Sequence, residues 1–448
     1  MTFKSLLDID CGIRFMYDRL PLSSSSARTM LLESRAMTSK REIDLRYGKL
    51  NSLYNKECRE IASKLTCLKD ISNTIGRLGA GAVLDDIELF EIKYLATVSR
   101  DVAELMQKKR ISVVNLPDLG DVMKILDPDS LNIPSFYIYD SYSSELAAVR
   151  KRMKALTGLG DRIPDENQAR ELAGLQQKND ELEEGVRREL SLKLSDKAGK
   201  LGHTLKNLSL LDIMIASVAQ MKEMGLCFPA VVENGETFYK GMFNPAVKEA
   251  VEQKGGRYVQ VDISFSRLPV TVVGANMGGK SVVLKSLALN QILAQFGLGI
   301  AAQTCCVSIV DKILFCIGDD QNAEKGISSF AAEMLAVNEV VEGVSRGENM
   351  LALLDEPARA TNPIEGTALV EGLLDVLQHA AGSTILATHY NIVNRNVKRY
   401  RVAGLKEGKM DYSLIETESG DVPHEAIAIA QQLGVNKEWI ESTKKYLN

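Results

Sequence analysis

The chain has 448 residues, 45% of them apolar and 25% charged, and a formal net charge of −5. These values are those of an ordinary globular protein, so they exclude a disordered, collagen-like or low-complexity chain. The length predicts roughly three domains, and the mildly acidic total gives no sign of a nucleic-acid binder unless a basic patch lies within it.

The cysteines and the apolar segments indicate where the protein works. The seven cysteines are scattered and include no C-x-x-C, so neither a disulfide framework nor a zinc site is expected, and a cytoplasmic location is favoured. Asp8 and Asp10 lie where a signal peptide would need an apolar run. The uncharged stretch 286–310 contains four Asn or Gln residues and two glycines, which favours a buried helix and a strand over a membrane span.

The first half of the chain is typical of long helices. Apolar residues recur at helical steps through 41–78, which as one unbroken helix would extend roughly 57 Å. A second amphipathic run covers 84–105, and a third, charge-rich helix is expected near 165–200. Because residues 145–206 hold 13 basic and 11 acidic side chains, a solvated helix face is favoured over a nucleic-acid track.

After about residue 228 the pattern changes to β-rich runs that alternate with helical segments. Such alternation predicts a mostly parallel sheet covered by helices. The fold class is therefore α + α/β, with the boundary between residues 225 and 239. The β-rich runs are 257–265, 269–273, 307–315, 350–354 and 384–387.

The strongest chemical signal is G-A-N-M-G-G-K-S at 274–281, which fits G-x-x-x-x-G-K-[ST] between an apolar strand and a helical stretch. Glycines let backbone N–H groups turn toward phosphates, and the helix N-terminus adds its positive dipole end. Lys280 is predicted to reach the β- and γ-phosphates of ATP, and the Ser281 hydroxyl to ligate Mg²⁺. The predicted nucleotide contacts are Gly274, Asn276, Met277, Gly278, Gly279, Lys280, Ser281 and Val282.

Two acids and a histidine follow later strands. Asp355 and Glu356 end an apolar run 75 residues after Lys280, as a Walker B element would. Alone, such a pair usually marks a strand end that meets solvent. The phosphate-binding loop (P-loop) at 274–281 makes the catalytic interpretation the favoured one here. Asp355 is predicted to hold Mg²⁺ through water and Glu356 to act as general base. His389 ends the next β-rich run, where ABC-class ATPases place a γ-phosphate sensor.

These motifs resemble those of the MutS family. The N-M-G-G-K core of the P-loop is similar to the family's own. Residues 326–334 resemble its signature loop, 355–366 its Walker B and D-loop, and 387–390 its switch. The tail 424–440 resembles its C-terminal helical dimerisation element. The resemblance implies three parts: a helical core and lever domain with a short clamp at 1–228, an ATPase domain at 229–420 and a dimerisation element at 421–448.

The resemblance also implies a composite site in a dimer. Each ATP would lie between the P-loop of one subunit and the signature loop of the other, so that Ser328 or Ser329 contacts the γ-phosphate of the partner's ATP. Tyr258 sits where the family usually has an aromatic that stacks on adenine, although a strand tyrosine is more often packing. Gln321 would orient water or Mg²⁺, within a segment similar to that of the recombination-suppressing branch.

The chain also departs from the family pattern. No Phe is followed two residues later by Glu, the wedge that intercalates at a mismatch, and the chain is expected to begin at the core helices and to lack a nuclease-like C-terminal domain. Ile327 replaces the signature-loop arginine of many members, and Ala-Thr-Asn-Pro at 360–363 replaces the D-loop Gly-Thr-Ser-Thr.

Three functions fit these features. The first is a Mg²⁺-dependent ATPase, a homodimer or a heterodimer with a related subunit, that acts on duplex or branched DNA. The second is a remodeller of a client protein such as an adenosylcobalamin-dependent aminomutase, and the third is a structural dimer without turnover. Glu356 and His389 disfavour the third. The net charge of −5 disfavours a strong grip on DNA, but the resemblance places a DNA transaction first.

Overall fold

A computed structural model describes the chain as two compact units, each assembled from separate stretches of sequence. The sheet unit comprises Met1–Pro21, Ser34–Asn51 and Ser217–Asn448, and the helical unit comprises Leu22–Glu33 and Ser52–Ala216. The predicted linear division at residues 228 and 420 stays a prediction. The described residues are 1–133, 135–157, 166–274, 278–317, 329–394, 396–406, 409–418, 427, 430, 431 and 434–445.

The helices of the first half are shorter than an unbroken 41–78 helix would be. That stretch forms three helices, and the side chain before each new N-cap residue accepts a free backbone N–H: Glu57 accepts that of Arg59 and Asp70 accepts that of Ser72. The helices are α4 (Lys40–Tyr54), α5 (Arg59–Leu65) and α6 (Ser72–Gly79). The sheet unit also begins with α1 (Phe3–Leu6) and α2 (Ile13–Asp18).

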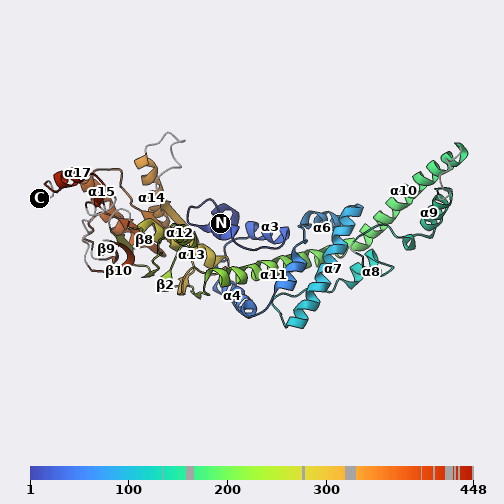
Figure 1. Cartoon of the computed structure of the whole chain (residues 1–448), viewed down its shortest axis with the longest axis horizontal. Coiled ribbons are helices and arrows are strands. Elements are labelled where there is room, and N and C mark those ends of the chain that lie inside the picture. The colour runs from blue at the N-terminus through green and yellow to red at the C-terminus, as the bar shows by residue number, and fades with distance from the viewer. Residues whose placement is uncertain are drawn as a thin grey trace. The chain divides into compact units, whose positions relative to one another are not determined.

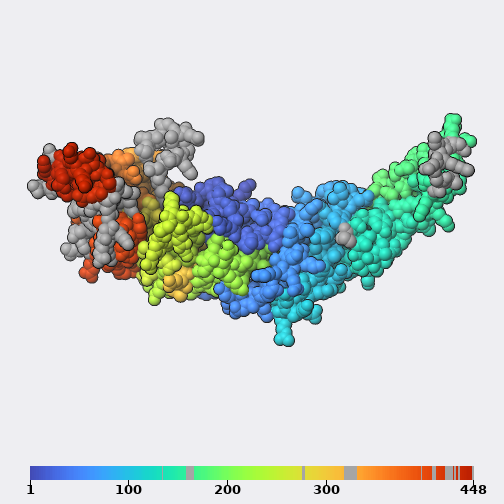
Figure 2. Space-filling view, in the orientation of Figure 1, coloured from blue at the N-terminus to red at the C-terminus, as the bar shows by residue number. Residues whose placement is uncertain are grey.

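In the helical unit all regular structure of the described residues is helical. The predicted 84–105 run is α7 (Asp86–Lys109), which begins with a capping box between Asp85 and Glu88. The predicted 165–200 helix ends early, as α10 (Glu166–Ser195), and α11 (Ala198–Met224) follows it. The remaining elements are α3 (Ser25–Glu33), α8 (Gly120–Leu126), η1 (Asp140–Tyr142) and α9 (Ser144–Thr157). Helix α9 lies along α10, and together they form a narrow projection of this unit (Figures 1 and 2).

A six-stranded sheet of order β10-β9-β4-β8-β7-β6 forms the core of the sheet unit. All neighbours pair in parallel except the β9–β10 hairpin, so the predicted mostly parallel sheet is confirmed. The central strands are buried almost throughout, as a parallel sheet covered on both faces requires. The strands are β4 (Val270–Val273), β6 (Lys312–Ile317), β7 (Met350–Asp355), β8 (Ser383–Thr388), β9 (Lys398–Lys406) and β10 (Lys409–Glu416).

Helices cover both faces of this sheet (Figure 1). On one face α14 (Ser329–Ser345) and α15 (Pro363–Leu377) pack on Met350, Ala352 and Leu354 of β7. Alternation turns the intervening residues of β7 to the other face, where α13 (Lys280–Gln295) contacts the strand. The uncharged stretch is thus a buried helix followed by a strand, as expected, and no helix in the described ranges has the length and apolar character to cross a bilayer.

A smaller sheet of order β1-β5-β2-β3 completes the unit. The predicted single run 307–315 is wrong, because the chain leaves this small sheet after Ser308 and enters the large one at Lys312. The strands are β1 (Ala230–Val232), β2 (Thr237–Met242), β3 (Val261–Phe265) and β5 (Thr304–Ser308). Among the described residues this unit also contains α12 (Pro245–Gln253) and, within the predicted dimerisation element, α17 (Lys437–Lys444).

Candidate nucleotide-binding site

Three motif residues meet at one edge of the large sheet because their strands are parallel neighbours. Register pairs the end of β4 with the end of β8, Val273 with Thr388, and the end of β7 with Ala387. The residues that follow these strands therefore leave the sheet at the same edge, where open parallel sheets bind their ligands. They are Gly274, Glu356 and His389.

The loop after β4 passes into α13 through Gly279, which caps the helix in a left-handed conformation (φ 81°). Lys280, the first residue of α13, is 4% exposed, and its Nζ donates to the Gly274 carbonyl at 2.9 Å. The lysine thus folds back over its own loop, as a phosphate-binding lysine must. Ser281 and Val282 occupy the first turn of α13, Gly278 is buried, and the predicted contacts Asn276 and Met277 lie outside the described residues.

Glu356 stands among three groups that carry or can take positive charge. Its Oε1 lies 3.1 Å from Lys280 Nζ, and its Oε2 lies 3.8 Å from His389 Nδ1 and 3.7 Å from Arg359 Nη1. His389 Nδ1 is buried and has no hydrogen-bond partner. The structure thus brings the predicted γ-phosphate sensor His389 and the predicted phosphate-binding Lys280 together around the carboxylate of Glu356, the predicted general base.

Asp355 and Ser281 form the part of the site that suits a divalent cation. Burial raises the pKa of Asp355, the charge of Glu356 adds to that rise, and a hydrogen bond with Ser281 opposes it. The Asp355 Oδ1 atom is buried without a hydrogen-bond partner. A carboxylate and a hydroxyl side by side, with one carboxylate oxygen not hydrogen-bonded, are oxygen ligands of the kind that Mg²⁺ binds together with phosphate groups. The described residues hold no larger cluster of His, Cys, Asp or Glu fit for a metal.

The other predicted contacts have different outcomes. Tyr258 uses its hydroxyl within the fold, where it accepts the Asn244 N–H at 3.0 Å and bonds Ser286 of α13, and burial raises its pKa. Its stacking on adenine stays a prediction. Gln321 and Ser328 lie outside the described residues, and Ser329 is the first residue of α14.

Three further residues at this edge were not predicted. The Tyr412 ring of β10 lies beside the P-loop, since a Cβ added to Gly279 would come 3.2 Å from its Cδ1. Tyr390 and Glu333 both hydrogen-bond the backbone of Ala358, two residues after Glu356. Glu333 and Tyr390 fall inside the signature and switch motifs, which was a usable signal, whereas nothing near Tyr412 in the sequence marks it.

Comparison with known proteins finds a family match within the sheet unit. Residues 270–432 match the family model of MutS domain V, so the resemblance seen in the motifs is confirmed over this segment. The match covers β4 to β10 and with them every described residue of the site discussed above except Tyr258.

Similar proteins named Endonuclease MutS2 extend the likeness beyond that segment. The protein of Caldanaerobacter subterraneus is 29% identical over 291 residues, which are 62% of this chain and 35% of that protein. The Thermus thermophilus protein is 31% identical over 218 residues, 49% of this chain and 28% of its own length. The Pelotomaculum thermopropionicum protein is 25% identical over 459 residues, an alignment that covers 85% of this chain and 56% of that protein. The chain thus spans about a quarter to just over half of these relatives.

Proposed function

We propose that this MutS-like chain binds ATP with Mg²⁺ at the edge formed by β4, β8 and β7 and hydrolyses it to ADP and phosphate. The observation that carries the proposal is the cluster of Lys280, Glu356 and His389 beside the Asp355–Ser281 pair. A phosphate-binding lysine, a carboxylate base, a neighbouring imidazole and a cation site are the parts that P-loop hydrolysis uses.

The ion pair between Lys280 and Glu356 indicates how the residues would share the work. In the structure the ammonium is held by Glu356 and the Gly274 carbonyl. Phosphate oxygens would compete for the same ammonium, and Glu356 would then be free to accept a proton from water at a carboxylate oxygen. His389 Nδ1, which has no partner, could donate to a phosphate oxygen. Mg²⁺ held by Ser281 and Asp355 would neutralise phosphate charge.

Two substitutions test the ATPase assignment. Lys280→Ala should abolish ATP binding, whereas Glu356→Ala should keep ATP bound and stop turnover, both measured with a fluorescent ATP analogue and by phosphate release. Lys312→Ala is the control, because this lysine begins β6, at the strand end opposite the proposed site, and pairs with Glu339. Equal turnover in Glu356→Ala and the wild type would remove Glu356 as the base.

We further propose that the ATPase acts as a dimer in a DNA transaction. Support comes from the MutS domain V match and from the relatives' name, which describes those proteins as endonucleases. The protein-remodelling alternative has no such support.

Filter binding of duplex, mismatched and branched DNA across a salt series tests the DNA role. Each phosphate contact that releases a counterion steepens the salt dependence. We expect binding at low salt that changes with ATP in the wild type and does not change with ATP in Lys280→Ala. Absence of binding at low salt with ATP would refute the DNA role and leave the ATPase assignment intact.

A further inference from the structure

The backbone of Ala358 is held from two sides by side chains of different elements. Its N–H donates to the Glu333 carboxylate of α14. Its carbonyl accepts the Tyr390 hydroxyl at 2.8 Å, and Tyr390 directly follows His389 after β8. One residue of the turn after Glu356 is therefore held by Glu333 of the signature motif and by Tyr390, the neighbour of His389.

This turn needs support, because its backbone is unfavourable for L-residues. Glu356 (φ 49°) and Ala358 (φ 63°) both lie in the left-handed region without being glycine. Besides the two bonds at Ala358, the turn is held by the Glu356 N–H, which donates to the Ala387 carbonyl of β8 at 2.9 Å. Removing either bond at Ala358 would let the turn relax and the Glu356 carboxylate move away from its place beside Lys280 and His389.

Helix α15 carries a glycine, Gly366, at the place where it packs against the Tyr390 hydroxyl. A Cβ on Gly366 would come 2.3 Å from the hydroxyl oxygen and 3.1 Å from the Ala358 carbonyl. Tyr390 is buried, and the charges of Glu333 and Glu356 add to burial in raising the pKa of its phenol, so it stays a hydrogen-bond donor at neutral pH. The space beside Gly366 therefore accommodates the Tyr390 hydroxyl, which donates a hydrogen bond to the Ala358 carbonyl.

We propose that Glu333 and Tyr390 are positioning residues for ATP hydrolysis, which hold the Ala358 backbone and through it the orientation of the Glu356 carboxylate. The inference rests on the proposed ATPase function. Glu333 lies one turn after Ser329 on α14, and Tyr390 is adjacent to His389. The same two bonds therefore connect the proposed base with the segment predicted to contact the γ-phosphate of its own site and with the segment predicted to contact that of the partner's ATP.

Removing the tyrosine hydroxyl alone tests the first bond. We expect Tyr390→Phe to lower kcat about 10-fold or more, part of the roughly 10²–10⁴-fold that a general base contributes, while KM for ATP stays within twofold. Tyr400→Phe is the matched control, because this buried hydroxyl of β9 bonds Ser264 in the same unit, away from the turn. A Tyr390→Phe enzyme with wild-type kcat would overturn the proposal.

Glu333 is tested by a pair of variants of similar size. Glu333→Gln keeps an oxygen that can accept the Ala358 N–H, whereas Glu333→Met does not. Hydrogen–deuterium exchange of residues 356–361 should be faster in Glu333→Met and Tyr390→Phe than in the wild type, and nearly unchanged in Glu333→Gln. Exchange of residues 356–361 in Glu333→Met that matches the wild type would overturn the proposal, whether or not the variants differ in thermal stability.

The two readouts separate this inference from the function on which it rests. A wild-type protein without ATP turnover would refute the proposed function, and the exchange data would still decide whether Glu333 and Tyr390 hold the turn. Turnover in the wild type with normal kcat in either Tyr390→Phe or Glu333→Met would refute the positioning role alone. Lower kcat in Glu333→Met, restored in Glu333→Gln, is the expected result.

Discussion

At the scale of single residues, both the backbone conformation and the space at position 279 favour glycine. Gly279 caps α13 at φ 81°, and a Cβ there would come 3.2 Å from the Tyr412 ring. We expect Gly279→Ala to lower the free energy of unfolding by about 1–2 kcal/mol, the cost of a left-handed L-residue. It should also weaken ATP binding, because Tyr412 or the loop must move. Urea unfolding and titration with a fluorescent ATP analogue measure the two effects.

Gly255 supplies the control for this prediction. It also has a left-handed conformation (φ 75°), but a Cβ there would meet nothing within 4 Å. Gly255→Ala should therefore lose similar stability and keep wild-type affinity for ATP. If both variants lose affinity equally, backbone strain and not the Tyr412 contact is responsible.

The buried ion pair of Lys93 and Asp127 in the helical unit carries a pH dependence. Burial by itself would raise the pKa of Asp127, but the Asn132 N–H, the Tyr139 hydroxyl and the Lys93 ammonium outweigh it and lower that pKa. A carboxylate with a lowered pKa in the folded state stabilises the fold above its unfolded pKa, about 3.9. This stabilisation is lost as the pH falls through the folded pKa.

We therefore expect Asp127→Asn to cost about 3–5 kcal/mol at neutral pH, because Lys93 would stay buried without its counter-charge. The difference from the wild type should begin to shrink below about pH 3.9, where Asp127 of the unfolded chain binds a proton, and should vanish as the pH falls through the lowered folded pKa. Urea unfolding between pH 3 and 7 measures both. Asp101→Asn makes the same change in the more exposed Lys64–Asp101 pair and should cost at most about 1 kcal/mol. Equal losses in the two variants would contradict the role of burial.

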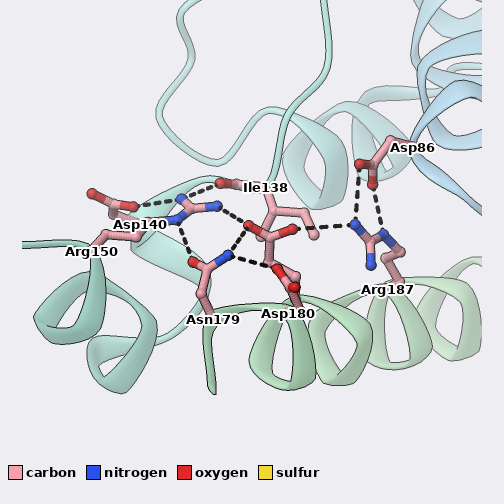
Figure 3. Close-up of polar contacts among 8 residues, drawn as sticks. Asp86, Ile138, Asp140, Arg150, Asn179, Asp180 and Arg187 are labelled. Carbon is pink, nitrogen blue, oxygen red and sulfur yellow. Dashed lines mark hydrogen bonds and ion pairs between the residues drawn. The ribbon is translucent and has the colours of Figure 1, made fainter. Parts of the chain in front are cut away.

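At the scale of elements, Arg150 fastens α9 to α10 and to the segment before α9. Figure 3 shows its guanidinium between the Ile138 carbonyl and Asp140 on one side and Asn179 of α10 on the other. It also donates to Glu183 of α10 at 2.9 Å. In the same figure Arg187 of α10 reaches Asp86 at the start of α7 with two hydrogen bonds. Four hydrogen-bond partners on one half-buried arginine make this the main polar link of α9.

We expect Arg150→Ala to speed amide exchange in α9, with a loss of about 1–3 kcal/mol in local opening free energy from charge-assisted hydrogen bonds. Arg152→Ala removes an arginine from the same helix whose pair with Glu171 is more exposed, so its loss should be smaller than that of Arg150→Ala. Hydrogen–deuterium exchange of both variants at one pH provides the comparison. Similar exchange in the two variants would show that the Arg150 network contributes no more than a surface ion pair.

Prediction from the sequence succeeded for the apolar strands that carry the motifs, and failed for helix breaks inside a continuous apolar period and for contacts between distant residues. The strands before Gly274, Asp355 and His389 were predicted because parallel buried strands are continuous apolar runs. The prediction of one helix over 41–78 was wrong, because new helices begin inside this unbroken apolar period, where Glu57 and Asp70 accept free backbone N–H groups. The contacts of Tyr412 with Gly279 and of Glu333 with Ala358 join residues far apart in sequence, and only the fold brings them together.

At the scale of the whole molecule, the proposed dimer needs an apolar surface near the site, and the sheet unit has one. Ile364 at the start of α15 is 82% exposed, and Val393, four residues after His389, is 76% exposed. The Val393 N–H donates to Glu371 of α15, so both apolar side chains lie on or beside one helix. We expect the proposed dimer to cover these two side chains, because removing apolar surface from water favours association.

If a second copy covers this surface when ATP is bound, a charge there should block the dimer and leave the monomer intact. We expect Glu356→Ala to sediment as a dimer with ATP, and Ile364→Asp in that background to remain a monomer with unchanged ATP binding, since burying an unpaired carboxylate is unfavourable. Leu192→Asp is the control, because Leu192 is equally exposed on α10 of the helical unit. A dimer that persists in Ile364→Asp and is lost in Leu192→Asp would move the interface to the helical unit.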